Sequence, residues 1–403
     1  MVPEGWSVRS IGETGKVHAG RQRSPHFTEG KPRTYLRVAN VFDGKIDTSD
    51  LLTMPFTDGE YERYRLQEGD ILLNEGQSLE LVGRSAIYRG EPPECCFQNT
   101  LVRYRADRKT DTTFAWNLFH HCLHTGVFAG IATKTNSIAH LGVSRFAELK
   151  LRFPPLPEQK KIGEILSTWD AAIETSEKLL VNAEAQKRAL MQQLLLGKRR
   201  LKGFEGTEWA HVKIGSVLKE VRRNVDWSDD DLYSLLSLRR RSRGLFLRQR
   251  LHGREILTKG MKTTKAGDFL ISKMQVVHGA MAMTPAKYDG MHISNSYISL
   301  IPRNKDRLQI RFFDWLSRMP CMYRLAYLSS YGVHIEKMTF NLDWFLEEKI
   351  DMPATANEQT RIADVLDAAQ CEVDALIAAK GKLLNEKRAL MQQLLTGKRR
   401  VQP

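Results

Sequence analysis

Two histidines in this sequence have a spacing that could support metal chemistry. His120 and His124 are four residues apart, which places both imidazoles on one face of a helix, where they could bind a metal ion. No second pair of ligands stands out elsewhere in the sequence. Packed or hydrogen-bonded histidines on a helix over residues 114–128 are therefore the favoured interpretation.

Acid-base chemistry of the kind found in nucleases has one candidate group. Asp343, Glu347 and Lys349 combine two carboxylates with an amine. They fall in an apolar, amphipathic stretch at 342–350 and lack the usual strand context, so a solvated structural face is favoured. The sequence also has no GxxxxGK[ST], HExxH or GxSxG motif, no GxGxxG after a strand, and no Asn-Pro-Pro-aromatic tetrapeptide. We expect no catalytic residue, no bound cofactor and no metal ion in this chain.

Polar and basic side chains gathered in predicted loops are the chemistry that remains. Arg and Lys pair with guanine edges, Asn and Gln pair with adenine, and all four residue types can bind phosphates. Each such residue taken alone is more often simply solvated, so the indication comes from the whole set. The candidate DNA-binding residues are Arg21, Arg23, Lys31, Arg33, Asn74, Gln77, Lys134, Asn136, His140, Arg239, Arg240, Arg241, Arg243, Lys273, Gln275, His278, Tyr331 and His334.

The net charge agrees with a polyanionic partner. Sixty-one basic and 47 acidic residues give +14, and neutralising phosphates releases their condensed counterions. Residues 202–352 carry +8 of this charge, whereas 1–153, 154–201 and 353–403 carry +2 each. Most of the excess positive charge therefore lies in residues 202–352.

Length and composition indicate a globular protein of two domains. The chain has 403 residues, of which 42% are hydrophobic and 27% charged. The first residues show no signal peptide, and no apolar run reaches the length of a bilayer crossing, so we expect a soluble, cytoplasmic protein without a membrane partner. The five cysteines form no CxxC pair, which suits a reducing compartment and argues against disulfides and a zinc ribbon.

A tandem repeat organises the chain. KRALMQQLLLGKRR at 187–200 returns as KRALMQQLLTGKRR at 387–400, an offset of 200 residues. At this offset, 17 of the 44 residues from 158 to 201 are identical. The chain therefore consists of a module, a helix, a second module and a second helix, in that order.

Both repeated segments read as helices of about 40 residues with a 3.5-residue apolar seam. A homodimeric coiled coil would give such a seam, but two in-phase copies in one chain can also pair with each other. The helix-pairing residues are Ile162, Leu166, Trp169, Ile173, Leu180, Leu190 and Leu194 in the first copy, and Ile362, Leu366, Val373, Leu376, Leu383, Leu390 and Leu394 in the second.

The predicted helix ends follow from residue type. Pro157 suits a first helical turn and Asn357 suits an N-cap. Gly197 and Gly397 stand where a carboxyl-terminal stop belongs, each followed by Lys-Arg-Arg, whose charges complement the helix dipole.

The modules between the helices read as mixed domains rich in strands. Short β-branched and aromatic runs bounded by Gly and Pro predict strands, and longer apolar stretches predict helices. The predicted strands cover 35–41, 71–74, 101–104 and 296–301, and the predicted helices cover 114–128 and 312–328. We predict an α/β (α+β) fold.

At this level the chain resembles the specificity subunits of type I restriction-modification systems, nearly from end to end. The most specific similarities are PPLPEQKKIGEIL at 154–166 and the paired KRALMQQLLxGKRR blocks. YLRVANVFDGKID (35–47), GDILLNEGQS (69–78), CCFQNTLVRYR (95–105) and SIAHLGVSRFAELKLRFPPLPEQ (137–159) are similar to stretches of many target-recognition domains. The second module is less similar to these sequences, and DMPATANEQ takes the place of the proline-rich PPLPEQ segment of the first repeat.

The resemblance implies two target-recognition domains, 1–153 and 202–352, separated by antiparallel coiled-coil helices within 154–201 and 353–403, with internal pseudo-two-fold symmetry. It implies readout of a bipartite, asymmetric site on double-stranded DNA. It also implies two methyltransferase subunits that use S-adenosylmethionine to methylate adenine, and motor-nuclease subunits that use ATP and Mg²⁺. A nuclease or methyltransferase acting alone and a coiled-coil scaffold without DNA readout remain as alternatives.

Overall fold

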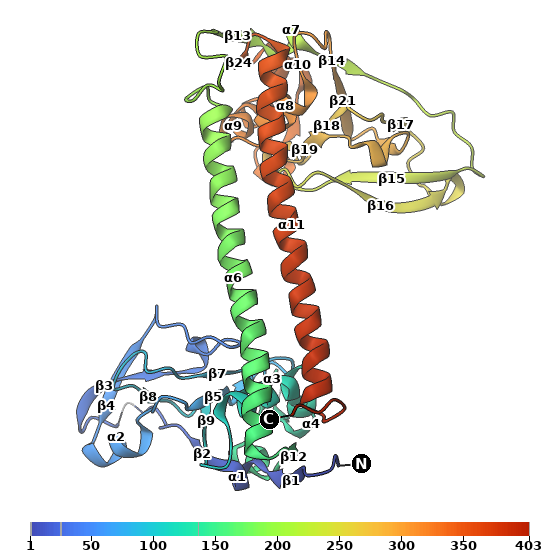
Figure 1. Cartoon of the computed structure of the whole chain (residues 1–403). Coiled ribbons are helices and arrows are strands. Elements are labelled where there is room, and N and C mark those ends of the chain that lie inside the picture. Colours follow the sequence, from blue (N-terminus) through green and yellow to red (C-terminus); the bar gives the residue numbers. More distant parts are fainter. Residues whose placement is uncertain (1, 25, 136, 403) are drawn as a thin grey trace. The chain divides into compact units, whose positions relative to one another are not determined.

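The computed structural model describes residues 2–24, 26–135 and 137–402. By its internal contacts the chain divides into two compact units, Met1–Glu177 with Ala378–Pro403, and Lys178–Ile377. The predicted mixed class of helices and sheets is confirmed (Figure 1).

Two long helices contribute to both units. Helix α6 (Leu156–Leu194) and helix α11 (Ala356–Leu394) each have 39 residues. The first unit holds the opening part of α6 and the closing part of α11, and the second unit holds the other two parts. The units therefore cut across the segments 154–201 and 353–403, because each part of a helix packs with its own module.

A four-stranded antiparallel sheet forms the centre of the first module, in the order β2-β9-β5-β7. Ile71 pairs with Tyr104 and Leu73 with Val102, and these side chains pack on the buried Phe119 of helix α3. The elements are β2 (Gly15–Ala19), β5 (Ile71–Asn74), β7 (Ser85–Ile87), β9 (Leu101–Ala106) and α3 (Thr112–His124).

Three smaller sheets complete this module. Their orders are β4-β3-β8, in which β3 and β8 are parallel, β10-β11-β6, and the antiparallel pair β1-β12. The elements are β1 (Ser7–Ser10), α1 (Ile11–Thr14), β3 (Lys31–Leu36), η1 (Val38–Asn40), β4 (Leu52–Phe56), α2 (Asp58–Tyr64), β6 (Gly76–Gln77), β8 (Cys96–Phe97), α4 (Val127–Ile131), β10 (Thr133–Thr135), β11 (Ile138–His140), α5 (Val143–Glu148) and β12 (Lys150–Phe153).

The second module repeats this topology. Its central antiparallel sheet has the order β14-β21-β18-β19, in which every strand takes the place of its counterpart in β2-β9-β5-β7. The strands are β14 (Leu218–Val221), β18 (Phe269–Ser272), β19 (Met281–Met283) and β21 (Tyr297–Pro302). The faint sequence likeness between the modules therefore reflects one shared fold.

The other elements of the second module also have counterparts in the first. A sheet of order β16-β15-β20-β17 contains a parallel contact between β15 and β20, as β3 and β8 do, and β13-β24 matches β1-β12. The elements are β13 (Trp209–Lys213), α7 (Ile214–Val217), β15 (Leu232–Leu238), β16 (Leu245–His252), η2 (Gly253–Glu255), β17 (Met261–Thr263), η3 (Val276–His278), η4 (Ala286–Tyr288), β20 (His292–Ser294), α8 (Ile310–Leu316), α9 (Pro320–Leu328), β22 (Ser330–Tyr331), η5 (Ile335–Lys337), β23 (Thr339–Phe340), α10 (Leu342–Glu347) and β24 (Lys349–Pro353).

Within each unit the two helix segments run antiparallel. In the first unit Ile162 and Leu166 of α6 share a buried cluster with Leu394 of α11. Lys387 contacts Asp170, and Lys380 contacts Glu177. The contact seven residues later on α6 is therefore made seven residues earlier on α11, as expected for antiparallel helices. In the second unit Leu194 of α6 shares a cluster with Ile362 and Leu366 of α11.

Both long helices end three residues before the predicted glycines, and one helix start does not follow the prediction. Gly197 and Gly397 have φ of +66° and +72°, left-handed values that glycine adopts without strain. The N–H of Glu358 donates to Oγ1 of Thr355 at 3.3 Å, and α11 begins at Ala356. Asn357 therefore lies in the first turn and the N-cap prediction was wrong, because a threonine one residue before the helix can make this contact.

Two predicted helices and one predicted strand are interrupted. Residues 114–128 span α3 and α4, which are divided by Gly126 at φ +77°. Residues 312–328 span α8 and α9, and Pro320, which has no N–H to donate, opens α9. The strand predicted at 35–41 ends at Leu36 and turns into η1.

Candidate nucleic-acid interface

The candidate arginines of the first module differ in their freedom to meet DNA. Arg21 is buried, its Nε donates to Glu60 at 2.8 Å, and its guanidinium lies 4.9 Å from the ring centre of Phe56. Arg33 on β3 donates to Glu94 at 2.6 Å and lies over the Tyr61 ring. By contrast, Arg23 and Lys31 are exposed, and Lys31 approaches Asp58 at 3.8 Å.

The small sheet β10-β11-β6 brings three other candidates of the first module together. Lys134 and Gln77 are both register partners of Ala139, and His140 is the next residue on the shared strand. His140 Nδ1 lies 3.0 Å from Glu75 Oε2. Asn74 is fully buried and donates to the Val41 carbonyl oxygen at 3.3 Å, while Asn136 lies outside the described residues.

In the second module, the loop that joins β15 to β16 carries Arg239, Arg240, Arg241 and Arg243. Its backbone is held against the turn at η3, because Arg241 N donates to His278 O at 2.7 Å and Ser242 N donates to Gly279 O at 2.9 Å. Arg241 and Ser242 adopt φ of +59° and +50°, which side chains other than glycine rarely adopt. Two separate loops thus form one basic surface.

A third loop joins this surface through Glu336 of η5. Its carboxylate accepts from Arg240 at 2.9 Å and lies 3.2 Å from His278 Nε2. Exposed Tyr331 and His334 belong to the same segment as Glu336, and Lys273 O accepts from Phe340 N at its far end. With Gln275 in the turn before η3, the structure gathers the second-module candidates on three neighbouring loops.

Several exposed arginines on this hairpin are not engaged by acidic groups. Arg243, Arg248 and Arg250 form no ion pair within the part of the chain that the structure describes. Arg248 and Arg250 were not among the candidate DNA-binding residues. Both lie on β16. The register between β15 and β16 shifts between Leu235 and Leu236, and a β-bulge of this kind changes the direction in which nearby side chains point. The signal available in the sequence was the place of these two arginines in the arginine-rich stretch 239–250.

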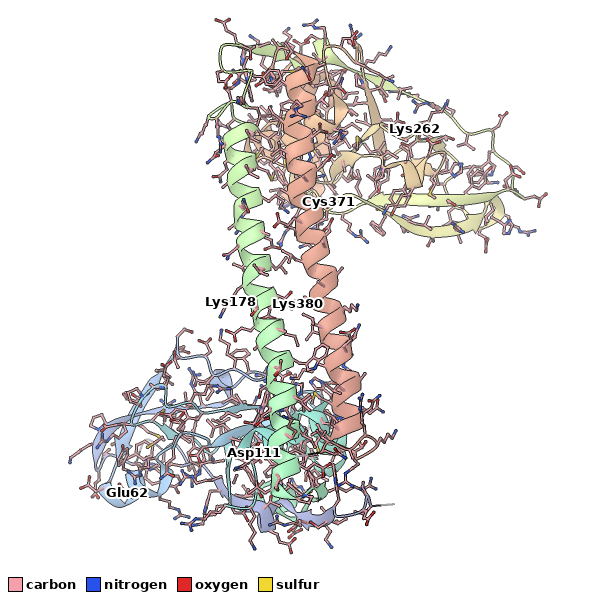
Figure 2. All side chains as sticks on the ribbon, viewed as in Figure 1. Glu62, Asp111, Lys178, Lys262, Cys371 and Lys380 are labelled. Atoms are coloured by element: carbon pink, nitrogen blue, oxygen red, sulfur yellow. The ribbon has the colours of Figure 1, made fainter. Side chains whose placement is uncertain are left out.

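Some of the positive charge in this module does not face solvent. Lys262 of β17, labelled in Figure 2, is buried, and its amine donates to Tyr297 O at 2.5 Å. Burial lowers the pKa of this amine. Lys262 therefore contributes to the packing of the sheet rather than to a DNA-facing surface.

A buried aspartate anchors the central sheet of each module at the repeated Gly-Asp sequence. Asp70 accepts from Arg105 Nε at 2.6 Å and from Arg105 Nη2 at 2.7 Å. Asp268 accepts from Arg223 through both oxygens, with one contact at 3.1 Å. Each carboxylate also accepts the backbone N–H three residues before it. The two-oxygen ion pair fixes the strand that leads to the candidate loops.

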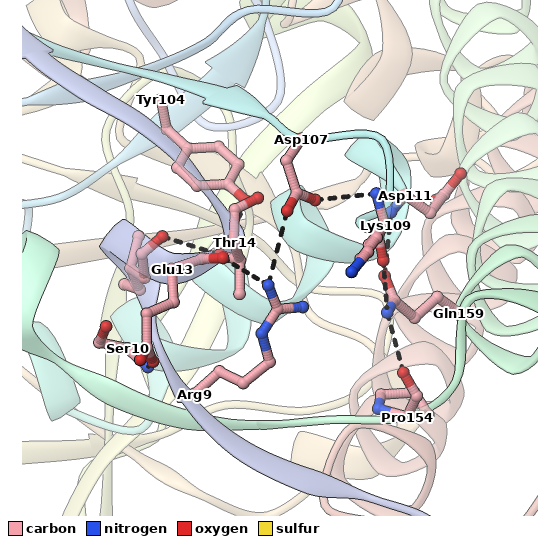
Figure 3. Close-up of polar contacts among 11 residues, drawn as sticks. Arg9, Ser10, Glu13, Thr14, Tyr104, Asp107, Lys109, Asp111, Pro154 and Gln159 are labelled. Atoms are coloured by element: carbon pink, nitrogen blue, oxygen red, sulfur yellow. Dashed lines mark hydrogen bonds and ion pairs between the residues drawn. The ribbon is translucent and has the colours of Figure 1, made fainter.

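The repeated Glu-Gln pair joins each long helix to its module. Gln159 Oε1 accepts from Asp111 N, and its Nε2 donates to Pro154 O at 2.8 Å and to Lys109 O (Figure 3). Gln359 repeats these contacts with Gln309 N, Pro353 O and Arg307 O. Each glutamine therefore satisfies backbone groups on two sides of a helix start.

The glutamate of each pair holds the closing end of the other long helix. Arg400 donates to Glu158 at 2.8 and 2.9 Å, and Arg200 donates to Glu358 at 2.8 and 2.7 Å. Both carboxylates are almost completely buried. We call these two contacts the end clamps.

The predicted helix-pairing residues all lie on the packed sides of their helices. None of these 14 residues is exposed. Seven of them are fully or nearly fully buried: Ile162, Leu166, Leu194, Ile362, Leu366, Val373 and Leu394.

Of the candidate nuclease residues, Glu347 forms an exposed ion pair with a lysine outside the group. Glu347 ends α10 and accepts from Lys213 at 2.6 Å, with both side chains more than half exposed. Lys349 is the register partner of Lys213 across β13 and β24. These contacts support the interpretation as a solvated structural face.

Known proteins are similar to this chain in its first part and over its whole length. Residues 3–185 match the family model described as type I restriction modification DNA specificity domain. The putative type I restriction enzyme MjaX specificity subunit of Methanocaldococcus jannaschii is 25% identical over 419 residues, which cover 99% of this chain and 95% of that protein. The chain is thus similar to type I restriction-modification specificity subunits over nearly its whole length.

Solved structures of type I specificity subunits share the fold along the whole chain. The S subunit from M. genitalium superposes with a TM-score of 0.57 at 15% identity and covers 98% of this chain and 96% of that one. A chain from a study of complex assembly and conformational transition of the type I R-M system gives a TM-score of 0.60 at 17% identity and covers 98% of both chains. No helix of the described residues is long and apolar enough to span a membrane.

Proposed function

We propose that this chain is the DNA sequence-specificity subunit of a type I restriction-modification complex and reads one half of a bipartite, asymmetric DNA site with each module. The observation that carries this proposal is the repeated sheet order, β2-β9-β5-β7 and β14-β21-β18-β19, with a different set of polar and basic loops on each copy. One scaffold with two different loop sets suits two half-sites of different sequence.

In this proposal, partner subunits carry out the reactions on DNA. Two methyltransferase subunits bind S-adenosylmethionine and methylate adenine, and restriction subunits use ATP and Mg²⁺ to move and cut DNA. This chain is non-catalytic, holds none of these cofactors and works in the cytoplasm. The sequence supports this division of labour, because it contains no GxxxxGK[ST] phosphate-binding loop and no Asn-Pro-Pro-aromatic tetrapeptide.

Exchange of one module tests the proposal. Residues 202–352 are replaced with the corresponding module of another specificity subunit, and the methylated adenines are mapped after expression with the partner methyltransferase. We expect one half-site to change and the other to stay, because base-edge contacts are local to a module. A change in both half-sites, or methylation and cleavage by the purified chain alone, would contradict the proposal.

A point variant sharpens the test within the second module. We expect Arg243→Ala to weaken binding to the cognate site by about 1–3 kcal/mol if the guanidinium contacts a base edge, and to relax sequence preference in one half-site. Arg222→Ala is the matched control, because Arg222 is an exposed arginine already paired with Glu220. Fluorescence anisotropy with wild-type and half-site-mutated DNA measures both effects.

A further inference from the structure

Three side chains of the first module direct their ligand atoms at one point. His120 Nε2 lies 3.0 Å from Asp43 Oδ2 and 3.0 Å from His124 Nε2, and His124 Nε2 lies 3.4 Å from Asp43 Oδ2. The two histidines are four residues apart on α3, whereas Asp43 comes from the loop between η1 and β4. The histidine pair expected to be merely packed thus has a third potential ligand, 77 residues away in sequence.

Hydrogen bonds alone do not account for all three short contacts. Each Nε2 atom carries at most one hydrogen, and an ionised carboxylate carries none. If His120 donates to Asp43, its Nε2 has no lone pair for His124. If His124 instead donates to His120, the lone pair of His120 is taken and its contact with Asp43 has no proton. One cation at the centre would satisfy the three atoms together.

The triangle has the dimensions of one face of a tetrahedral metal site. Ligands about 2.0–2.1 Å from a zinc ion at tetrahedral angles are separated by roughly 3.3 Å. The point equidistant from the three atoms lies roughly 1.8 Å from each in their plane, so an ion about 1 Å out of that plane reaches ordinary Zn–N and Zn–O distances. Shifts of a few tenths of an ångström would open the two 3.0 Å edges to the tetrahedral separation.

Neighbouring contacts hold the loop of Asp43 and the ring of His120 in place. The loop that carries Asp43 is closed by the bridge between Val41 and Ile46, and Gly44 N donates to Ser85 O at 3.0 Å. The His120 ring packs against Trp116, with ring centres 5.7 Å apart. The side chains of His120, Asp43 and His124 are 16%, 41% and 46% exposed, so a metal ion can enter from solvent.

We propose that Asp43, His120 and His124 form a binding site for a divalent transition-metal ion such as Zn²⁺, which fastens the 41–46 loop to α3. Three protein ligands leave a fourth position for water. Nδ1 of His120 is buried and has no hydrogen-bond partner among the described residues, so the site lacks one of the outer contacts that strengthen metal binding.

Zinc titration of the purified full-length chain, after treatment with a chelator, tests the site by isothermal calorimetry. We expect one Zn²⁺ per chain, binding at least tenfold weaker in His124→Gln and in Asp43→Asn, and a melting temperature that rises by a few degrees with zinc in the wild type. His211→Gln is the matched control, because His211 forms an exposed contact with Asp351 at 2.6 Å that includes no second histidine.

Cobalt provides a readout that is independent of stability. Co²⁺ bound at a site of two histidines and one aspartate should give visible absorption bands, and these should disappear in His124→Gln, a change at a half-exposed side chain. The proposal is overturned if the wild type binds no more Zn²⁺ than His124→Gln does, or if His211→Gln reduces binding as much as the other variants.

Discussion

Glu158 is an ionised side chain in an almost fully buried position, and its partners explain how the charge is kept. Burial opposes ionisation, but the Arg400 guanidinium, the Val401 N–H and the indole N–H of Trp6 hold the pKa of Glu158 below its ordinary value. Removal of one partner from such a buried ion pair leaves the other charge uncompensated and destabilises the fold.

The lowered pKa of Glu158 predicts an acid-sensitive contribution to stability. A carboxyl group whose pKa is lower in the folded state stabilises the fold fully above its unfolded pKa, about 4.3, and loses that effect as the pH falls through the folded pKa. We expect Glu158→Gln to reduce the free energy of unfolding at pH 7 by roughly 2 kcal/mol, and by progressively less below about pH 4.5.

Urea unfolding of both proteins between pH 7 and pH 3.5 measures this difference. Glu164→Gln on the same helix is the control, since Glu164 is exposed and its contact with Lys161 is 3.4 Å long. A loss of stability in Glu158→Gln that stays constant across this pH range would show that the ion pair is not its cause.

At the residue scale the sequence could identify the Glu-Gln pair of each repeat but not the partners of the glutamates. Glu158 and Arg400 are 242 positions apart, and the repeat alignment matches Glu158 with Glu358, not with an arginine. The contact of Asp43 with the histidines of α3 could not be predicted from the sequence for the same reason. A single sequence shows which residues recur and leaves long-range pairing to the fold.

The two long helices carry a repeated polar contact within their apolar seam. Lys387 is 7% exposed along its side chain and its Nζ lies 2.5 Å from Asp170 Oδ1, whereas the equivalent Lys187 donates to Gln370 at 2.9 Å. Repeat positions 170 and 370 thus hold an acid in one unit and an amide in the other.

This natural pair predicts the effect of substitutions at position 170. Asp170→Ala leaves the buried ammonium of Lys387 without its acceptor, and we expect a loss of about 2–3 kcal/mol in the free energy of unfolding. Asp170→Gln reproduces the contact of the other unit and should lose less than half of that. Urea midpoints compare the variants, and equal losses would show that a glutamine cannot replace the carboxylate as the acceptor at this position.

At the element scale the 3.5-residue period and the terminal glycines were sufficient to predict both long helices. The predicted strands at 71–74, 101–104 and 296–301 also correspond to β5, β9 and β21, with shifts of up to two residues. The interruptions were missed because apolar periodicity continues through Gly126 and Pro320, where the backbone does not.

For the whole molecule, the two end clamps predict how half of the chain should behave. A fragment of residues 1–201 keeps Glu158 but lacks Arg400, and its own Arg200 is the equivalent of Arg400 in the repeat. A second copy can therefore supply the missing guanidinium, and the fragment should form a symmetric dimer.

Sedimentation equilibrium of the fragment measures this association. We expect Arg200→Met in the fragment to weaken dimerisation at least tenfold, because Glu158 would then lose the guanidinium that the second copy supplies. Arg199→Met removes a neighbouring exposed arginine and serves as the control. A fragment that stays monomeric at tens of micromolar would contradict the exchange of end clamps.

The surroundings of Arg400 have a further consequence for chain connectivity. Arg400 donates to Glu4 O at 2.6 Å, so in the first unit the end of α11 meets the segment before β1, just as residues 201–208 join the end of α6 to β13 in the second unit. The polypeptide is in effect a ring with one open bond. A circular permutant, joined by a short linker between residues 402 and 2 and opened between the exposed Gly203 and Gly206, should keep the same fold and direct methylation to the same DNA site.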